Sequence, residues 1–480
     1  MKVVHIASEV NPFIKTGGLA DVVGELPIAL AKNDIESVVI LPLYSKIEKF
    51  YREQFEFIKH FDVYLGIGKK YAGIFKYVRN KVTYYFIDNE SYFGRNGIYG
   101  YDDEGERYGF FQMAAIELIG HLQLRPDIVH CHDWQSGMVS VLYYEKYQYY
   151  PFYENIRFVF TVHNPAYQGN YSLDILDRIF GISKETYYYG KTRFNDNVSY
   201  LKSALIYSDY VTTVSKSYKN ELCSIEGGYG LQNIFSYRYD DLFGIVNGID
   251  YEAYNPDDDM QLVYHYNKND FSNKVKNKIL IQKRYELEVN ENIPLLACIT
   301  RLTWQKGIEL ILDNAERLIL ENNVQLFIIG SGDYYYEKRL QELRDRYPKN
   351  VAIYLGYNNE LARKVYAASD MFLMPSLFEP CGISQLISLR YGTIPIVREV
   401  GGLKDTIVPY NEFTSRGTGF SFANFNNIEF YNIICYALSF YHQKDRWNDL
   451  IRQAMEVDWS WDKQCKEYID LYNKLLRAYK

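Results

Sequence analysis

A glycine pair near the amino terminus constrains this chain most, because it joins an apolar strand pattern to a helical pattern. The apolar run 3–7 is followed by Lys15, Thr16, Gly17 and Gly18, and then by the helical stretch. Two adjacent glycines let the backbone turn sharply and leave room for a ligand beside it. The helix start directs free N–H groups at that ligand, which suits a phosphate. The pattern predicts a phosphate-binding turn, although glycine pairs at such corners are often turns only.

The second half of the chain repeats this pattern. Gly401 and Gly402 follow the apolar run 394–397 and precede a helical stretch, as Gly17 and Gly18 do. Backbone amides of this second turn are also suited to phosphate. A simple corner is again the alternative.

The length, charge and cysteine pattern of the chain limit the classes of protein to which it can belong. A chain of 480 residues is too long for one ordinary core, so two or more domains are expected. The net charge is −7 and no dense basic run is present, so we expect no nucleic-acid partner. The amino terminus shows no signal-peptide pattern, and no apolar run approaches the ~20 residues of a membrane span. The 6 cysteines form no C-x-x-C pair, and together these features predict a cytoplasmic protein with reduced thiols.

Short apolar runs alternate with amphipathic stretches along the whole chain. This alternation predicts an α/β protein with parallel sheets wrapped by helices. The strands expected in the first half include 2–7, 37–41, 82–87, 127–131, 156–162, 210–214 and 243–247. Those expected in the second half are 294–299, 324–329, 351–355, 370–374 and 394–397.

A polar stretch without a core period begins at Asn255 and predicts a domain boundary. We expect an amino-terminal domain at 1–255, a boundary segment at 256–278 and a second domain at 279–457. The remainder, 458–480, is expected to be a helix that returns to the first domain. Two doubly wound domains would carry their binding loops at the carboxyl ends of their strands.

Two cations stand where a strand ends and a helix begins. Arg301 and Lys306 lie in the turn after the expected strand 294–299. Arginine binds phosphate through two hydrogen bonds, and lysine adds a point charge. Positive charge gains nothing from the dipole at a helix start, so a structural role explains the pair less well than a role in binding a diphosphate.

A second turn, after the expected strand 370–374, carries Glu379 between Phe378 and Pro380. A carboxylate there can accept hydrogen bonds from sugar hydroxyls, or it can serve only as an acidic residue at a helix start. Cys381 follows, and we expect it to be a packed side chain because no activating base is evident.

Histidines and an aspartate follow two expected strands of the first half. His130, His132 and Asp133 end one strand, and His163 ends another. We expect the side chains of His130 and His132 to project to opposite faces. Because no further cluster completes a ligand set, we expect no metal site. Asp133 and His163 are site candidates because they lie at the carboxyl ends of strands.

The motifs taken together resemble the family of bacterial glycogen synthases and plant starch synthases. The likeness runs from Lys2 to the last helix, in the order and with the spacing of the family. The motifs are KTGGLADV (15–22), HDW (132–134), TVHNPAYQG (161–169), VNGID (246–250), RLTWQKG (301–307), SLFEPCG (376–382), RYGTIPIV (390–397) and GGLKDT (401–406). The departures Pro165, Lys216 and Lys404 remove no charged or catalytic group.

The resemblance implies a GT-B fold, in which two Rossmann-like domains face each other across a cleft. It implies a glycosyltransferase that moves glucose from ADP-glucose to the non-reducing end of an α-1,4-glucan, retains the anomeric configuration and needs no cofactor or metal. The expected partners are therefore ADP-glucose and glycogen or a malto-oligosaccharide, with no membrane. A UDP-glucose-using enzyme and an inactive glucan-binding scaffold are the alternatives.

The resemblance also implies roles for individual residues. The expected catalytic residues, near the phosphates, the departing ADP and the glucose, are Lys15, His163, Arg301, Lys306 and Glu379. Tyr357 is expected to stack on adenine, and Gly401 and Gly402 to offer backbone contacts. Residues expected on the acceptor side are Glu9, Asp133, Trp134 and Asn247. Further substrate-binding residues are expected at Gly17, Gly18, Asp21, Asn164, Cys381 and Gly382.

Overall fold

A computed structural model describes residues 1–478 and divides the chain into two compact units. The first unit holds Met1–Ile245 together with the chain from Gln464 onward, and the second holds Val246–Lys463. Helix α18 (Trp461–Ala478) thus returns the chain to its amino-terminal part. Tyr479 and Lys480, the end of the expected segment 458–480, lie outside the described residues.

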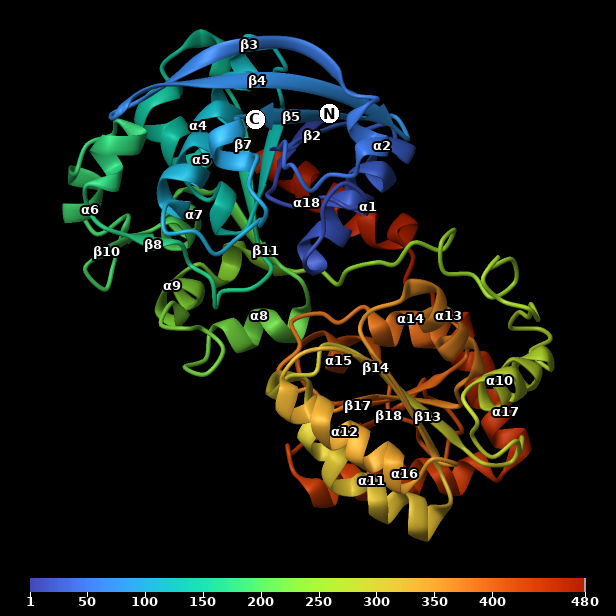
Figure 1. Ribbon diagram of the computed structural model, residues 1–480. Helices are drawn as coiled ribbons and strands as arrows, with labels where there is room; N and C mark the ends of the chain where they lie inside the picture. Colours follow the sequence, from blue (N-terminus) through green and yellow to red (C-terminus); the bar gives the residue numbers. More distant parts are fainter. Residues whose placement is uncertain (479–480) are drawn as a thin grey trace. The chain divides into compact units, whose positions relative to one another are not determined.

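The main sheet of the first unit has the strand order β12-β11-β7-β6-β1-β2-β5-β4-β3 (Figure 1). Neighbours from β12 to β5 pair in parallel, and β4 pairs antiparallel with β5 and with β3. The central strands are almost wholly buried and mostly apolar, as is typical of parallel strands covered on both faces. Strand bounds are β1 Lys2–Ile6, β2 Glu36–Pro42, β3 Glu56–Leu65, β4 Gly68–Arg79, β5 Val82–Asp88, β6 Ile128–His132, β7 Arg157–Val162, β11 Tyr210–Thr213 and β12 Leu242–Gly244.

Helices and a small antiparallel sheet surround these strands. The small sheet joins β8 (Asn170–Tyr171), β10 (Asn197–Ser199) and β9 (Arg193–Phe194) in that order. The helices are α1 Gly18–Lys32, α2 Lys49–Arg52, α3 Glu90–Phe93, α4 Glu104–His121, α5 Met138–Leu142, α6 Glu185–Tyr188, α7 Tyr200–Tyr207, α8 Lys216–Leu222 and α9 Gln232–Tyr237. Helix α18 buries Tyr468 and Tyr472, and Tyr472 reaches His130 on β6.

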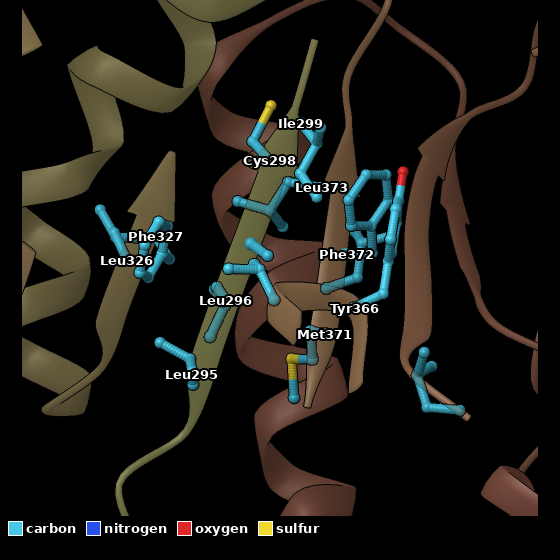
Figure 2. Close-up of a cluster of buried hydrophobic side chains, with 14 of the residues drawn as sticks. Leu295, Leu296, Cys298, Ile299, Leu326, Phe327, Tyr366, Met371, Phe372 and Leu373 are labelled. Atoms are coloured by element: carbon cyan, nitrogen blue, oxygen red, sulfur yellow. The ribbon is translucent and has the colours of Figure 1, made fainter. Parts of the chain in front are cut away.

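The sheet of the second unit is parallel throughout, with the order β15-β14-β13-β16-β17-β18. Its strands are β13 Leu295–Ile299, β14 Gln325–Gly330, β15 Val351–Leu355, β16 Met371–Met374, β17 Ile394–Arg398 and β18 Phe420–Phe422. Figure 2 shows the apolar core around β13, where Leu296, Phe327 and Phe372 come from three neighbouring strands. This core holds the strand ends in place.

Helices cover both faces of the second sheet. Figure 1 shows α11, α12 and α16 on one side and α13 and α14 on the other. The bounds are α10 Asn273–Arg284, α11 Ile308–Asn322, α12 Tyr334–Arg346, α13 Asn359–Ala368, α14 Ser384–Arg390, α15 Gly401–Thr406, α16 Asn427–Tyr441 and α17 Lys444–Glu456. The side chain of Asn358 caps α13 by accepting from the backbone N–H of Leu361. Among residues 1–478, every helix is too short or too polar to cross a membrane.

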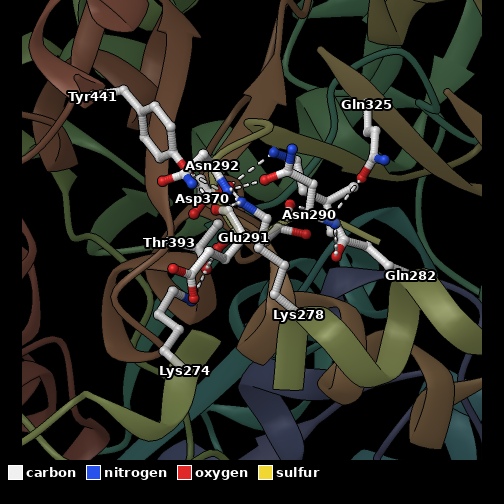
Figure 3. Close-up of polar contacts among 12 residues, drawn as sticks. Lys274, Lys278, Gln282, Asn290, Glu291, Asn292, Gln325, Asp370, Thr393 and Tyr441 are labelled. Carbon is white, nitrogen blue, oxygen red and sulfur yellow. Dashed lines mark hydrogen bonds and ion pairs between the residues drawn. The ribbon is translucent and has the colours of Figure 1, made fainter. Parts of the chain in front are cut away.

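The segment 256–278, expected as a boundary, packs into the second unit through polar contacts (Figure 3). The buried ammonium of Lys278 on α10 lies 2.6 Å from Asp370 Oδ2 and 3.0 Å from the Tyr441 hydroxyl. Lys274, one turn earlier, donates to three backbone carbonyls, including that of Tyr391 at 3.0 Å, and to Thr393 Oγ1. Since polar side chains make these contacts, a search for apolar periodicity does not detect the packing.

Candidate active site

In the first unit, most of the candidate residues follow three adjacent strands. Glu9 and the glycine turn follow β1, Asp133 and Trp134 follow β6, and His163 follows β7. Because β7, β6 and β1 are parallel neighbours, their carboxyl ends meet at one edge of the sheet.

Glu9 organises the turn that precedes α1. Its carboxylate accepts hydrogen bonds from the backbone N–H of Thr16, from Thr16 Oγ1 at 2.6 Å and from the N–H of Gly17 at 3.3 Å. The hydroxyl of Tyr99 also donates to Glu9, at 2.5 Å. Glu9 is only 4% exposed, so it holds the turn from the inside.

The fold does not require glycine at positions 17 and 18. A Cβ built on either would meet nothing within 4 Å, and neither has a left-handed φ. Their lack of side chains therefore leaves open space in front of the amino terminus of α1. Lys15 lies beside this space and pairs with Asp21 Oδ1 at 2.7 Å. Burial raises the pKa of Asp21, while the Lys15 ammonium opposes that rise.

The side chain of Asp133, after β6, forms hydrogen bonds with the backbone after β7. Its Oδ1 accepts from the backbone N–H of His163 at 2.7 Å and of Asn164 at 3.4 Å. Its own backbone has φ 54°, a left-handed conformation that side chains other than glycine rarely adopt. Burial raises the pKa of this carboxyl to about 7, although the two amide hydrogen bonds oppose the shift.

Trp134 is buried against the segment after β7. A Cβ on Gly169 would lie 2.5 Å from the Trp134 ring, and Gly169 has φ +61°. Both constraints require glycine at this position of the TVHNPAYQG motif. Asn164 in the same motif accepts from the backbone N–H of Ala166 at 3.0 Å.

The histidine side chains lie together, which corrects one expectation. The rings of His130 and His132 stack with centroids 4.2 Å apart, so they project to the same face. Residues two apart on a strand always share a face, and the expectation of opposite faces was wrong for that reason. His5, from β1, joins them and lies 3.3 Å from His132 through Nδ1 and Nε2.

Ring nitrogens of His5, His130 and His132 lie within 4.8 Å of one another, close enough for a metal ion. Both nitrogens of His130, however, are within hydrogen-bond distance of hydroxyls, those of Tyr472 at 2.7 Å and Thr161 at 2.6 Å. Both nitrogens of His132 pair with other histidines. The donor set fits a hydrogen-bonded cluster better than a coordination shell.

In the second unit, the candidate loops follow β13, β16 and β17, which are parallel neighbours. The Lys306 ammonium, in the loop after β13, lies 2.6 Å from Glu379 Oε2, in the loop after β16. The Ser376 hydroxyl donates to the same oxygen at 3.1 Å. Both charged side chains are largely buried, whereas Arg301 in the first of these loops is exposed. The arrangement places one ion-paired cation, Lys306, and one exposed cation, Arg301, at the same sheet edge.

Gly401 and Gly402 differ from the first glycine pair. A Cβ on Gly401 would lie 2.0 Å from the carbonyl oxygen of Glu379, and one on Gly402 would lie 2.1 Å from that of Cys381. Gly401 also has φ +44°. The backbone of this turn therefore packs directly on the Glu379 loop, which glycine alone allows.

Cys381 and Gly382 lie in that loop and Asn247 lies next to Cys381, whereas Tyr357 follows the edge strand β15. Burial raises the pKa of the Cys381 thiol to about 12, which supports a packed rather than a nucleophilic side chain. Gly382 has φ +76°. Asn247 is 4% exposed, and its buried Oδ1 has no hydrogen-bond partner among residues 1–478. Tyr357, after β15, is 72% exposed.

Sequence reasoning missed Tyr99, His5 and His132 as contributors. Tyr99 is one of 49 tyrosines, so nothing in the sequence distinguishes it. His5 and His132 could have been recognised from the sequence, because each lies on a strand expected to end at the site. On such a strand, residues two apart share a face of the sheet.

Comparison with known proteins identifies relatives along the whole chain. Residues 2–237 match the family described as starch synthase catalytic domain, and residues 281–454 match glycosyl transferases group 1. Glycogen synthase of Clostridium kluyveri is 48% identical over 476 residues, which cover 99% of this chain and 100% of that one. That of Clostridium beijerinckii is 46% identical and covers 99% of each. The catalytic domain of starch synthase IV from Arabidopsis thaliana, bound to ADP and acarbose, has a TM-score of 0.91 at 32% identity and covers 99% of each chain.

Proposed function

Because this chain belongs to the family of bacterial glycogen synthases and plant starch synthases, we propose that it is a retaining glucosyltransferase with the GT-B fold. It transfers glucose from ADP-glucose to the non-reducing end of an α-1,4-glucan. The relatives named glycogen synthase and the starch synthase structure with ADP support this function.

The observation that carries the proposal is the Lys306–Glu379 pair with Arg301 at the carboxyl edge of the second sheet. A leaving diphosphate gains negative charge as its bond to the sugar breaks, and preorganised cations stabilise that charge. Lys306 is held by Glu379, whose Oε2 also accepts from the Ser376 hydroxyl, so the cation needs little reorganisation when the diphosphate departs. Arg301 is exposed and free to bind a phosphate through two hydrogen bonds.

The reaction is a substitution on the face from which the diphosphate leaves. The bond from the glucose anomeric carbon to the phosphate oxygen breaks, and a bond to the O4 oxygen of the acceptor forms. The proton of that hydroxyl goes to the phosphate oxygen, so ADP leaves with the charge balanced. Glu379 accepts hydrogen bonds from the glucose hydroxyls, and His163 contacts the glucosyl group.

The first unit supplies Lys15 and Gly18 near the phosphates and the donor sugar, and it supplies acceptor-side residues. Lys15 and the open space beside Gly17 and Gly18 suit negatively charged or sugar oxygens close to the backbone. Glu9, Asp133 and Trp134 are the acceptor-side residues of this unit. Glu9 accepts from the backbone of Gly17, and Asp133 accepts from the backbone of His163 and Asn164. Asp21 keeps Lys15 in place when no ligand is bound.

The nucleotide base is adenine in this proposal. Tyr357 offers an exposed ring on which a base stacks, and base–aromatic stacking contributes about 1–3 kcal/mol. Stacking alone does not separate adenine from uracil, since every base has a π face. The donor therefore needs a direct test.

The decisive experiment offers the purified protein ADP-glucose or UDP-glucose, each labelled in the sugar, with glycogen as acceptor. We expect label to enter glycogen at least tenfold faster from ADP-glucose, and a digestion that starts at non-reducing ends to release it first. Faster transfer from UDP-glucose would overturn the choice of donor. Glucan binding without transfer from either donor would show that the protein is a scaffold.

A further inference from the structure

Three imidazoles form a line across adjacent strands of the first sheet. His5 Nδ1 on β1 lies 3.3 Å from His132 Nε2 on β6, and His132 Nδ1 lies 3.1 Å from His163 Nε2 after β7. Successive rings are therefore within hydrogen-bond distance of each other through one nitrogen of each ring. His5 and His132 are fully buried, and His163 is 9% exposed.

Burial keeps these rings neutral. It lowers the pKa of His5 and of His163 to about 3, and lowers that of His132 well below its ordinary value. A neutral imidazole carries one N–H and one acceptor nitrogen. In a line of such rings, the position of the hydrogen on the first ring determines its position on every other ring.

The environment of His5 selects between the two possible orders. Its Nε2 is buried and has no hydrogen-bond partner among residues 1–478. A buried N–H without a partner is rarer in proteins than a buried acceptor without one. The hydrogen of His5 therefore lies on Nδ1, from which it is donated to His132 Nε2. His132 in turn donates from Nδ1 to His163 Nε2, and the hydrogen of His163 lies on Nδ1.

We infer that His5 and His132 are positioning residues, which fix His163 as the tautomer with its hydrogen on Nδ1. The inference rests on the proposed function in one respect, that His163 contacts the transferred glucosyl group. His163 then acts as a neutral hydrogen-bond donor to a sugar oxygen through Nδ1 and is not a general base at that atom. The bond from its backbone N–H to Asp133, at 2.7 Å, holds the residue at the end of β7 in the same orientation.

The tautomer can be observed directly by ¹⁵N NMR of protein labelled in histidine. The chain has only 8 histidines, and a His163→Asn variant assigns the signals of His163. We expect the Nδ1 of His163 to be protonated and Nε2 not. A protonated Nε2 in the wild-type protein would overturn the inference, whatever the enzyme's activity.

Variants at His5 test the cause. His5→Phe keeps a buried ring and removes the donor, so His163 should become a mixture of tautomers. His5→Asn places an amide N–H near the position of Nδ1 and should restore the wild-type signals. Unchanged His163 signals in His5→Phe would show that His5 has no such role. His442→Asn, an exposed histidine after α16, should change neither the signals nor turnover.

Kinetics link the tautomer to the reaction. With ADP-glucose and glycogen, His5→Phe should lower kcat about tenfold or more, because a wrong tautomer withholds the hydrogen bond in the transition state. KM for each substrate should change little, and His5→Asn should recover most of kcat. Equal kcat for a folded His5→Phe and the wild type would overturn the link to turnover. Absence of transfer by the wild type would instead refute the proposed function, and the NMR result would still decide the tautomer.

Discussion

The Lys306 ammonium and the Glu379 carboxylate lie 2.6 Å apart at the ends of two neighbouring strands, β13 and β16. The pair is largely buried, and the Ser376 hydroxyl also donates to Glu379 Oε2. Because the two side chains are already in place, they need little reorganisation when a substrate binds. Such preorganisation favours a role in electrostatic catalysis over a merely structural ion pair.

Replacing Lys306 with alanine should lower kcat by about 10²–10³-fold, the cost of losing one preorganised group that stabilises a leaving anion. KM for glycogen should stay nearly constant, because the role proposed for this cation is on the diphosphate and not on the glucan. Steady-state rates of ADP release measure both. Lys364→Ala is the matched control, since Lys364 forms an ion pair with Glu360 on the surface of α13. Wild-type turnover in Lys306→Ala would exclude the proposed role.

Replacing Glu379 with glutamine should have opposite effects on binding and turnover. Removal of the negative charge frees Lys306 for the diphosphate, so ADP should bind more tightly by about 1 kcal/mol, or roughly fivefold. Turnover should fall, because the amide accepts hydrogen bonds from the glucose hydroxyls less strongly than a carboxylate does. Calorimetric titration with ADP measures the first effect. Weaker ADP binding would contradict this account, and Glu360→Gln serves as control.

The two glycine pairs should respond differently to alanine. Gly18→Ala meets no atom within 4 Å, so the free energy of unfolding should change by less than about 1 kcal/mol. If a ligand occupies that space, kcat/KM should fall about tenfold. Gly402→Ala meets the Cys381 carbonyl at 2.1 Å and should destabilise the protein by about 1–3 kcal/mol. Urea unfolding and initial rates separate the effects, and a fully active Gly18→Ala would show that no ligand fills the space.

The parallel strands could be predicted from the sequence because they are short, apolar and buried on both faces. Strand β14 was expected at 324–329 and lies at Gln325–Gly330, and β15 was expected and found at 351–355. Strands β3 and β4 were not predicted. Their residues are mostly half-buried or exposed, as at Glu56 and Lys69, so the hairpin lacks an apolar run.

The site could be predicted in part. Motifs placed residues such as Lys306 and Glu379 in loops after parallel strands, and the topology of such strands brings those loops to one edge. The sequence places His5 and His132 on strands that end at the site, but it does not predict their contact, because that contact depends on the strand order β6-β1. The polar packing around Lys274 and Lys278 was hidden for a different reason, since buried lysines have no periodic signature.

Tyr357 should contribute to nucleotide binding without contributing to stability. Its ring is 72% exposed, so Tyr357→Ala removes little packing. Loss of one stacking contact costs about 1–3 kcal/mol, and KM for ADP-glucose should rise about fivefold to a hundredfold. Tyr357→Phe should keep the wild-type value, as should Tyr334→Ala, which is 77% exposed on α12. An unchanged KM in Tyr357→Ala would place the base elsewhere.

Asp133 should make stability depend on pH. Burial raises the pKa of its carboxyl from 3.8 to about 7, so the folded protein keeps a proton that the unfolded chain has already lost between those values. Stability contributed by the protonated carboxyl is therefore present at low pH and declines as pH rises from about 4 to about 7, by up to about 1.4 kcal/mol per pH unit. Asp133→Asn does not titrate and can still accept from the amides of His163 and Asn164. Its free energy of unfolding relative to the wild type should rise across this interval and level off above it.

Urea titrations at intervals from pH 4 to pH 8 measure this difference. Asp102→Asn, at an exposed aspartate of the same unit, controls for the loss of one surface charge. Its curve should run parallel to that of the wild type. If the Asp133→Asn curve also runs parallel, the carboxylate is already ionised in the folded protein at low pH. The amides of His163 and Asn164 would then outweigh the cost of burial, because hydrogen bonds to the charged form lower a carboxyl pKa.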